Sequence, residues 1–349
     1  MRAVLLAMTA WLLQAVQVTA WADDVPVSAA GSNLTRLLEA ELSRWPARTG
    51  LYVKHLGTGE QAGVRAQEHF ESASTIKVPI MVLAYRLADQ KQLDLDARYE
   101  IKAADYRGGS GVFKYADVGL KPTLRDVITQ MIITSDNTAT DIMIAQVGGR
   151  DRVNEFLRQS GFGALRLNGT TYEFFRSSFE ALDLKYRSLT PQQVFALATD
   201  RPAFTEPYRE LIAQVKEASA RARMKEGSLG GQNMDETRWF GVAAPAQMAA
   251  MLEGIERCTL TRRESCDEMK RILRAQQVRH KIPHYLSVAV GNKTGDTGSV
   301  TNDVAIVQAR SGPIVIASYN MDVRGQRAEL DDRIGELARR IVGYFDGAL

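Results

Sequence analysis

The tetrapeptide S-T-I-K at residues 74–77 contains the residue types that nucleophilic catalysis needs. It opens a long apolar run, and a helix that begins there puts Ser74 and Lys77 on one face. A lysine amine within reach of a serine hydroxyl accepts its proton when burial or positive neighbours lower the pKa of the amine. Taken alone, the spacing also fits a helix start that Ser74 caps.

A second motif, S-D-N at residues 135–137, lies where one amphipathic segment ends and another begins. The hydroxyl of Ser135 can relay a proton there, and the amide of Asn137 can hold a substrate carbonyl. Ser, Asp and Asn are also the residues that helices prefer at their N-termini. By itself the tripeptide leaves open whether it serves a reaction or only begins the next helix.

A third motif, K-T-G at residues 293–295, lies at the end of a predicted strand, SVAVGNKTG. Lys293 and Thr294 can bind a carboxylate from the edge of that strand, and Gly295 lets a substrate approach the backbone closely. A lysine that protects an edge strand from pairing, followed by a turn, is the alternative interpretation.

The rest of the sequence predicts how the three motifs are positioned. Residues 34–45 and 327–345 are amphipathic at helical spacing, and residues 74–280 are predominantly helical by pattern. Five short strands are predicted at residues 50–56, 63–66, 287–291, 303–308 and 313–319. Two early and three late strands predict an α/β fold: one antiparallel sheet flanked by helices, with a helical subdomain inserted between its strands.

In their order and surroundings the three motifs resemble those of the class A β-lactamases and related penicillin-recognising serine hydrolases. The resemblance extends from about residue 34 to residue 345 and is densest in SASTIKVPI, ITSDNTAT and GNKTGDTGSVTNDVAIV. It implies a sheet domain beside a helical domain with the site between them. It also implies a serine hydrolase that opens the β-lactam amide through an acyl-enzyme and needs no cofactor.

The resemblance implies a role for each motif residue. Ser74 is the acylated nucleophile, Lys77 is its base or proton relay, and Ser135 passes a proton to the departing β-lactam nitrogen. The backbone N–H groups of Ser74 and Asp296 form the oxyanion hole. The implied substrate-binding residues are Asn137, Lys293, Thr294, Gly295 and Asp296, and Arg279 is a further candidate for positive charge near the carboxylate pocket.

A class A β-lactamase also needs a glutamate that activates water to release the acyl-enzyme, and its usual E-x-x-L-N string is absent here. Glu173 lies closest to the expected position, and Glu180 and Glu236 are the second and third choices. Without a competent glutamate the acyl-enzyme would persist, as in a penicillin-binding peptidase or an esterase-like hydrolase. A non-catalytic cell-wall or β-lactam sensor module is the alternative of another class.

The N-terminal segment and the two cysteines predict an exported protein. Residues 1–22 combine a basic start, an apolar run and an A-x-A site, which favours a cleaved signal peptide and the periplasm over a membrane anchor. Residues 23–349 then form one bilobed domain with an apparent insertion at 203–239. In an oxidising compartment Cys258 and Cys266 pair into a structural disulfide, or remain two buried thiols.

Composition excludes several other classes of function. The chain has 349 residues and a formal charge of +3 without a block of Lys or Arg, which argues against nucleic acid as a partner. Two cysteines and four histidines without an HExxH motif argue against a metal enzyme. The expected partner is a small β-lactam, and we expect a monomer without stable membrane insertion after cleavage.

Overall fold

The computed structural model describes residues 32–226 and 235–348. The predicted signal peptide, residues 1–22, and part of the predicted insertion, residues 227–234, lie outside the described residues. In the described part of the chain, no helix combines the length and the apolar composition that crossing a membrane requires. The first helix, α1 (Asn33–Leu42), begins at Ser32, whose Oγ accepts a hydrogen bond from the backbone N–H of Thr35 at 3.1 Å.

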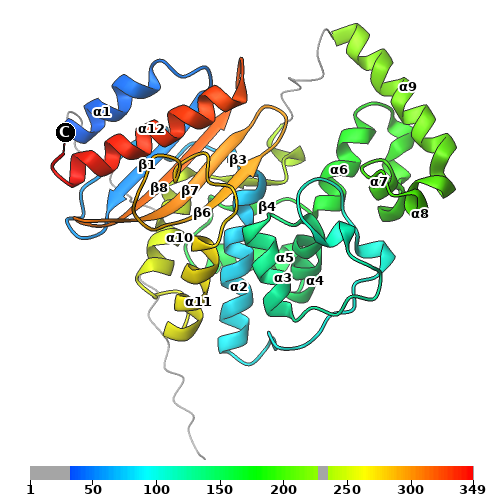
Figure 1. The fold of residues 1–349 in the computed structure, drawn as a ribbon, viewed down its shortest axis with the longest axis horizontal. Coiled ribbons are helices and arrows are strands. Elements are labelled where there is room, and N and C mark those ends of the chain that lie inside the picture. Colours follow the sequence, from blue (N-terminus) through cyan, green and yellow to red (C-terminus); the bar gives the residue numbers. More distant parts are fainter. Residues whose placement is uncertain (1–31, 227–234, 349) are drawn as a thin grey trace, which may run out of the picture.

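A five-stranded antiparallel sheet forms one half of the molecule, in the order β2-β1-β8-β7-β6 (Figure 1). Its strands are β1 (Arg48–His55), β2 (Gln61–Val64), β6 (Val290–Asp296), β7 (Thr301–Ala309) and β8 (Gly312–Met321). β1 pairs with β8 along its whole length, so the two ends of the chain are joined directly. The α/β class and the assembly of one sheet from both ends of the sequence are confirmed.

Helices cover both faces of this sheet. On one face lie α1 and α12 (Arg327–Phe345), and on the other lie α10 (Pro245–Glu256) and α11 (Arg263–Arg274) (Figure 1). Apolar side chains of α1 and α12 pack on Leu, Val and Ile residues of β1, β7 and β8 in one buried cluster. The sequence pattern predicted α12 with these bounds, because its apolar residues recur at helical spacing.

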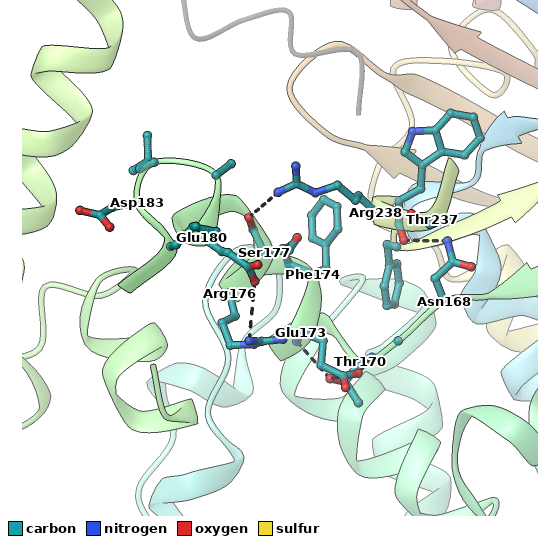
Figure 2. Close-up of a pocket in the computed structure, with 16 residues that line it drawn as sticks. Asn168, Thr170, Glu173, Phe174, Arg176, Ser177, Glu180, Asp183, Thr237 and Arg238 are labelled. Carbon is teal, nitrogen blue, oxygen red and sulfur yellow. Dashed lines mark hydrogen bonds and ion pairs between the residues drawn. The ribbon is translucent and has the colours of Figure 1, made fainter. Parts of the chain in front are cut away.

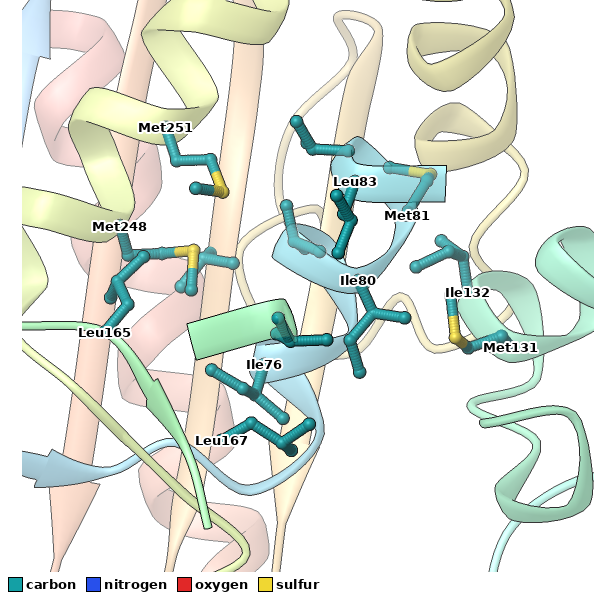
Figure 3. Close-up of a cluster of buried hydrophobic side chains, with 14 of the residues drawn as sticks. Ile76, Ile80, Met81, Leu83, Met131, Ile132, Leu165, Leu167, Met248 and Met251 are labelled. Carbon is teal, nitrogen blue, oxygen red and sulfur yellow. The ribbon is translucent and has the colours of Figure 1, made fainter. Parts of the chain in front are cut away.

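Helix α2 (Lys77–Asp89) joins the sheet half to the helical half. Its Ile80, Met81 and Leu83 belong to one core cluster with side chains of α3 (Leu124–Ile133) and α10 (Figure 3). Most of its side chains are buried on every side, so the helix is apolar around its circumference. The N-terminus of α2 therefore lies at the junction of the two halves, and the predicted nucleophile Ser74 lies three residues before it.

The helical half contains two groups of helices, and a small second sheet lies between it and the main sheet. The first group is α3, α4 (Asn137–Gln146) and α5 (Gly149–Gln159). The second group is α6 (Thr171–Glu180), α7 (Pro191–Ala196), α8 (Pro202–Thr205) and α9 (Arg209–Glu226). The second sheet, which the sequence did not indicate, has the order β3 (Phe70–Glu71), β5 (Gly241–Ala243) and β4 (Arg166–Leu167). In this sheet β3 lies beside β8, and β4 lies beside α5. Short 3-10 turns are η1 (Ala73–Ile76), η2 (Ala103–Asp105), η3 (Phe113–Tyr115), η4 (Leu184–Ser188), η5 (Glu206–Tyr208) and η6 (Glu236–Arg238).

The predicted insertion at 203–239 lies at the edge of the helical half. Its helix α9 (Arg209–Glu226) lies on the side of the helical half that is farthest from the sheet (Figure 1). Val215 of α9 is buried against Tyr186, Leu189 and Val194, which form a small cluster separate from the two main cores. The charged run that suggested a helix does form one, and this satellite cluster anchors it beside α6 and α7.

A disulfide joins Cys258 to Cys266, with the two sulfurs 2.02 Å apart. It links the turn after α10 to the first turns of α11, on the face of the sheet opposite α1 and α12. Of the two alternatives for these cysteines, the paired one is confirmed, and neither cysteine is free.

Candidate active site

Ser74 sits at the start of the buried helix α2, in the short turn η1. The residue before it, Ala73, has a φ of 43°, a left-handed conformation that costs a residue with a Cβ roughly 1 kcal/mol or more. The Nδ2 group of Asn302 holds this backbone by donating to the carbonyl oxygens of Glu71 at 2.8 Å and Ser72 at 3.2 Å. Ser74 is half-buried and lines a cavity of about 290 Å³.

The Ser135 hydroxyl lies between two buried ammonium groups. Lys77 Nζ donates to Ser135 Oγ at 3.2 Å, to the Ser135 carbonyl at 2.7 Å and to Asn137 Oδ1 at 2.8 Å. Lys293 Nζ donates to the same Ser135 Oγ at 3.0 Å and to the carbonyl of Thr294 at 2.7 Å. The structure therefore brings the lysines of the first and third motifs to the serine of the second.

Burial lowers the pKa values of both lysines. For Lys77 the pKa falls well below its usual value, because the side chain is fully desolvated and the charge of Lys293 lies nearby, although Asp136 and Asp141 act in the opposite direction. For Lys293, burial lowers the pKa to about 7, and the charges of Asp296 and Asp303 oppose this effect. An amine whose pKa is depressed in this way can accept the proton of a serine hydroxyl.

Asp136, the middle residue of the second motif, holds the loop in place. Its carboxylate accepts hydrogen bonds from the backbone N–H groups of Val112 at 2.6 Å, Phe113 at 2.7 Å and Ala139 at 2.8 Å. The preceding Ser135 has a φ of 55°, so the loop bends sharply just before the cap of α4. Of the two interpretations of the S-D-N tripeptide, capping of the next helix applies to Asp136, whose side chain is the N-cap of α4.

Gly295 lets strand β6 pass directly beside Ser74. A Cβ at this position would lie 2.7 Å from the Ser72 carbonyl oxygen and 3.0 Å from the Ser74 nitrogen, closer than side chains tolerate. The glycine is thus required by the close approach of two backbone segments. This approach places the strand that carries Asp296 against the turn that carries Ser74, as an oxyanion hole requires.

A buried carboxylate on α4 fixes the wall of the cavity opposite β6. Asp141 accepts from the Thr171 backbone N–H at 2.7 Å, from Thr171 Oγ1 at 2.8 Å and from the Tyr172 N–H at 3.1 Å. Arg107 Nε donates at 2.6 Å to Asp141 Oδ2, the oxygen that also accepts from Tyr172. These bonds pin the first turn of α6, so that Thr171, Phe174 and Phe175 line the cavity with Ser74.

The structure does not bring the three candidate glutamates to Ser74. Glu173 is exposed and its Oε2 caps α6, accepting from Thr170 N–H at 2.7 Å and Thr170 Oγ1 at 3.0 Å. Glu180 accepts from Arg187 Nε at 2.8 Å. Both glutamates line a second cavity of about 760 Å³ (Figure 2), which shares Phe174 and Phe240 with the cavity of Ser74. Glu236 is paired with Arg166 at 2.7 Å and with His69 at 3.1 Å.

The expected position of Glu173 is therefore corrected: its carboxylate faces the N-terminus of its own helix. A glutamate three residues after a Thr N-cap closes a capping box, and that local interaction determines where this side chain points. Among the described residues that line the cavity around Ser74, the single carboxylate is that of Asp296. Arg279, the candidate cation, is exposed and lines a different surface hollow.

Glu71, which the sequence analysis did not single out, is a buried carboxyl group close to the site. It lies three residues before Ser74 on β3, and one of its carboxyl oxygens has no hydrogen-bond partner. Burial raises the pKa of Glu71 to about 7, and a hydrogen bond from the Thr297 side chain lowers it by less. Thr297 lines the cavity of Ser74, so the hydrogen bond with Glu71 holds a residue of the cavity wall in place.

We expect the replacement Glu71→Gln to increase stability at alkaline pH. The pKa of Glu71 is raised on folding from 4.5 to about 7, so the wild type loses stability as pH rises through this interval, by about 3 kcal/mol when complete. The variant stays neutral and avoids this loss. Urea unfolding of both proteins at pH 5 and pH 8.5 measures the difference; a variant less stable than the wild type at pH 8.5 would contradict the prediction.

No metal centre is indicated by the described residues. Their one cluster of three possible ligands is Cys258, Cys266 and Asp267, and both sulfurs of this cluster are already bonded to each other in the disulfide. A metal ion would need thiolate ligands at these positions, and sulfurs joined in a disulfide are not thiolates.

Comparison with known proteins finds similar sequences and similar structures. The model of the beta-lactamase enzyme family matches residues 33–345. A beta-lactamase from Rhodobacter capsulatus is 32% identical over 150 residues, which is 43% of this chain and 50% of the relative. Beta-lactamase PSE-4 from Pseudomonas aeruginosa is 34% identical over 133 residues, or 38% and 45% of the two chains. The matches thus span about half the length of these curated relatives.

Solved structures are similar over nearly the whole chain. An ancestral class A beta-lactamase superposes with a TM-score of 0.66 at 22% identity, covering 89% of this chain and 99% of the other. A beta-lactamase from Sphaerobacter thermophilus gives a TM-score of 0.65 at 24% identity, covering 89% and 95%. The structure of PBP-A gives 0.65 at 20% identity, covering 92% and 99%. At these identities the likeness establishes the fold.

Proposed function

Because the chain belongs to the beta-lactamase enzyme family, we propose that it is a serine hydrolase that opens β-lactams through an acyl-enzyme on Ser74. The observation that carries this proposal is the Ser135 hydroxyl, which bridges the buried amines of Lys77 and Lys293 beside the cavity of Ser74. Binding alone needs no activated nucleophile, so this arrangement favours an enzyme over a sensor module.

In the proposed acylation, Ser74 Oγ attacks the β-lactam carbonyl carbon while its proton passes to the neutral amine of Lys77. The carbonyl electron pair moves to the oxygen, which the backbone N–H groups of Ser74 and Asp296 stabilise. When the C–N bond breaks, the nitrogen takes a proton from the Ser135 hydroxyl. The Lys77 ammonium, 3.2 Å from Ser135 Oγ, returns that proton and is neutral again.

A second candidate function is a serine enzyme that releases its acyl group slowly, such as a penicillin-binding peptidase. It is favoured by the wall of the cavity, where Thr171, Phe174 and Phe175 occupy the space beside Ser74 and no glutamate of the described residues lines it. Water without a nearby base attacks an ester slowly. The two candidates share acylation and differ in the rate of hydrolysis of the acyl-enzyme.

One experiment separates the candidates. The purified protein is mixed with a chromogenic cephalosporin, and the colour change and the protein mass are followed together. Many turnovers per protein molecule support the hydrolase, and a stable mass adduct supports the slow-release enzyme. Ser74→Ala abolishes either signal, whereas Ser43→Ala, on the exposed end of α1, retains it. Neither colour nor adduct with the wild type would overturn both candidates.

We expect Glu173→Gln to leave release of the acyl group nearly unchanged. Its carboxylate caps α6 outside the cavity, and glutamine can accept the same hydrogen bond from Thr170. The deacylation rate should therefore change by less than about threefold, the range of a surface substitution. The decay of the mass adduct measures this rate. Accumulation of the adduct at an unchanged acylation rate would show that α6 rearranges to bring Glu173 to Ser74.

The proposal includes export to the periplasm. The signal-peptide pattern of residues 1–22 motivates it, and the Cys258–Cys266 disulfide supports an oxidising compartment. The mass of the protein recovered from a periplasmic fraction tests it: the proposal requires a mature chain that begins near Asp23.

A further inference from the structure

An acidic side chain stands at the end of the site where a substrate carboxylate is expected. Thr294 and Asp296 are two residues apart on β6, so their side chains lie on the same face of the strand, about 7 Å apart along it. Asp296 lines the cavity of Ser74, and 36% of its side chain is exposed. An uncompensated charge at Asp296 would repel an anionic substrate that approaches Thr294.

A fully buried lysine compensates this charge. Lys281 Nζ lies 2.6 Å from Asp296 Oδ1, and none of the lysine side chain is exposed. The same ammonium group donates to the Asn302 carbonyl at 3.2 Å and lies 3.8 Å from Asp331 Oδ1. A buried charge of this kind is tolerated because it is paired and hydrogen-bonded on several sides.

Other polar groups orient Asp296 from the protein side. Thr301 Oγ1, which has one proton to donate, lies 2.6 Å from Asp331 Oδ1 and 3.1 Å from Asp296 Oδ1. Arg327, at the start of α12, lies 3.8 Å from Asp296 Oδ1 and donates to the Gly298 carbonyl at 2.7 Å. Because Arg327 is more distant and 37% exposed, solvent screens it, and the buried Lys281 is the stronger counter-charge.

We propose that Lys281 is a specificity-determining positioning residue, which neutralises Asp296 at the cavity rim and so lets the site accept substrates that carry a carboxylate. This inference rests on the proposed acylation of Ser74. Lys281 does not touch the substrate; it acts through Asp296.

The proposal predicts a difference between two substrates that differ by one charge. The probes are a cephalosporin with a free carboxylate and its methyl ester, and the measurement is the second-order rate constant for formation of the mass adduct. Lys281→Met should lower this constant about 10- to 50-fold for the acid, since one repulsion at about 7 Å is uncovered. For the ester the loss should stay below about threefold, because no charge is repelled.

A matched control separates this effect from general loss of packing. Lys54 on β1 is also largely buried and paired, with its Nζ 2.7 Å from Glu253 Oε2, but it lies between the sheet and α10. Lys54→Met should change the constants for acid and ester by the same factor. An equal loss of acid and ester reactivity in Lys281→Met would overturn the proposal, since a merely structural role affects both substrates.

Replacement of Asp296 tests the proposed role of Lys281 independently. In the double variant Lys281→Met/Asp296→Asn the acid-to-ester ratio should return to within about threefold of the wild type, as expected for coupled residues. Asp296→Asn alone should raise the ratio, and this variant decides the question if Lys281→Met does not fold. A lower ratio in Asp296→Asn would overturn the proposal. If neither substrate acylates the wild type, the proposed function fails as well. This outcome is distinct from a failure of the Lys281 proposal alone, in which the wild type is acylated.

Discussion

Replacing Lys77 with methionine is expected to slow acylation of Ser74 by about a thousandfold, the usual contribution of a positioned general base. Methionine fills a similar volume at this fully buried position but cannot accept the serine proton or hydrogen-bond to Ser135 and Asn137. The rate of mass-adduct formation with a penicillin measures the effect. Deacylation needs a separate measurement, because the variant forms so little adduct.

The assignment of Lys77 as the base also predicts how the acylation rate changes with pH. Burial and the charge of Lys293 lower the pKa of Lys77, so the reactive neutral amine exists at lower pH than for a free lysine. Acylation should therefore rise with pH until Lys77 has lost its proton. Lys293→Met removes a neighbouring positive charge, which raises the pKa of Lys77 and shifts this rise to higher pH. A shift to lower pH, or normal acylation by Lys77→Met, would contradict the assignment of Lys77 as the base.

Replacing Asp136 with alanine is expected to reduce the free energy of unfolding by about 4 kcal/mol, because it strands several buried donors. The backbone N–H groups of Val112, Phe113 and Ala139 all bond to this carboxylate, which is 1% exposed. The backbone of Gly111 packs tightly against Asp136, since a Cβ on Gly111 would lie 2.4 Å from the Asp136 Cα. Urea unfolding measures the loss.

The same substitution should also slow acylation, since Ser135 and Asn137 flank Asp136 and share its loop. Asp136→Asn keeps one acceptor oxygen and should fall between the wild type and Asp136→Ala in stability. The matched control is Asp126→Ala, which removes an exposed capping carboxylate from α3 and should cost about 1 kcal/mol. Equal losses in Asp136→Ala and Asp126→Ala would show that the buried donors find other partners.

The main sheet was predictable because its strands are dense in Val, Ile and Ala. The terminal helices were predictable from their 3.6-residue spacing, and α12 was predicted with its observed bounds. β6 was misplaced: the pattern ended at residue 291, whereas the strand runs to Asp296. Its polar residues Asn292, Lys293 and Thr294 are buried because β7 and η1 pack against the strand, whereas Asp296 at its end is exposed. That burial arises from tertiary contacts, which hydropathy does not register.

The second sheet escaped prediction for a related reason. Its strands are two or three residues long, too short to carry an alternating pattern, and their pairing joins residues far apart in the chain. Phe70 pairs with Ala243, for example, across the whole helical half. The placement of Glu173 failed differently, since distance along the sequence indicated a position near Ser74 whereas a local capping box turned the carboxylate away.

The sequence by itself determined the fold class and predicted the nucleophile and its lysine partners, because apolar spacing identifies the elements and three short motifs in order indicate the chemistry. Tertiary structure alone decided which carboxylates reach the cavity. Asp296 meets Lys281, 15 residues earlier, only because the end of β6 folds beside it, and Asp141 meets Thr171 only because α4 and α6 pack together. Spacing in a sequence reports which side chains share an element, whereas charges separated along the chain interact only after packing brings their elements into contact.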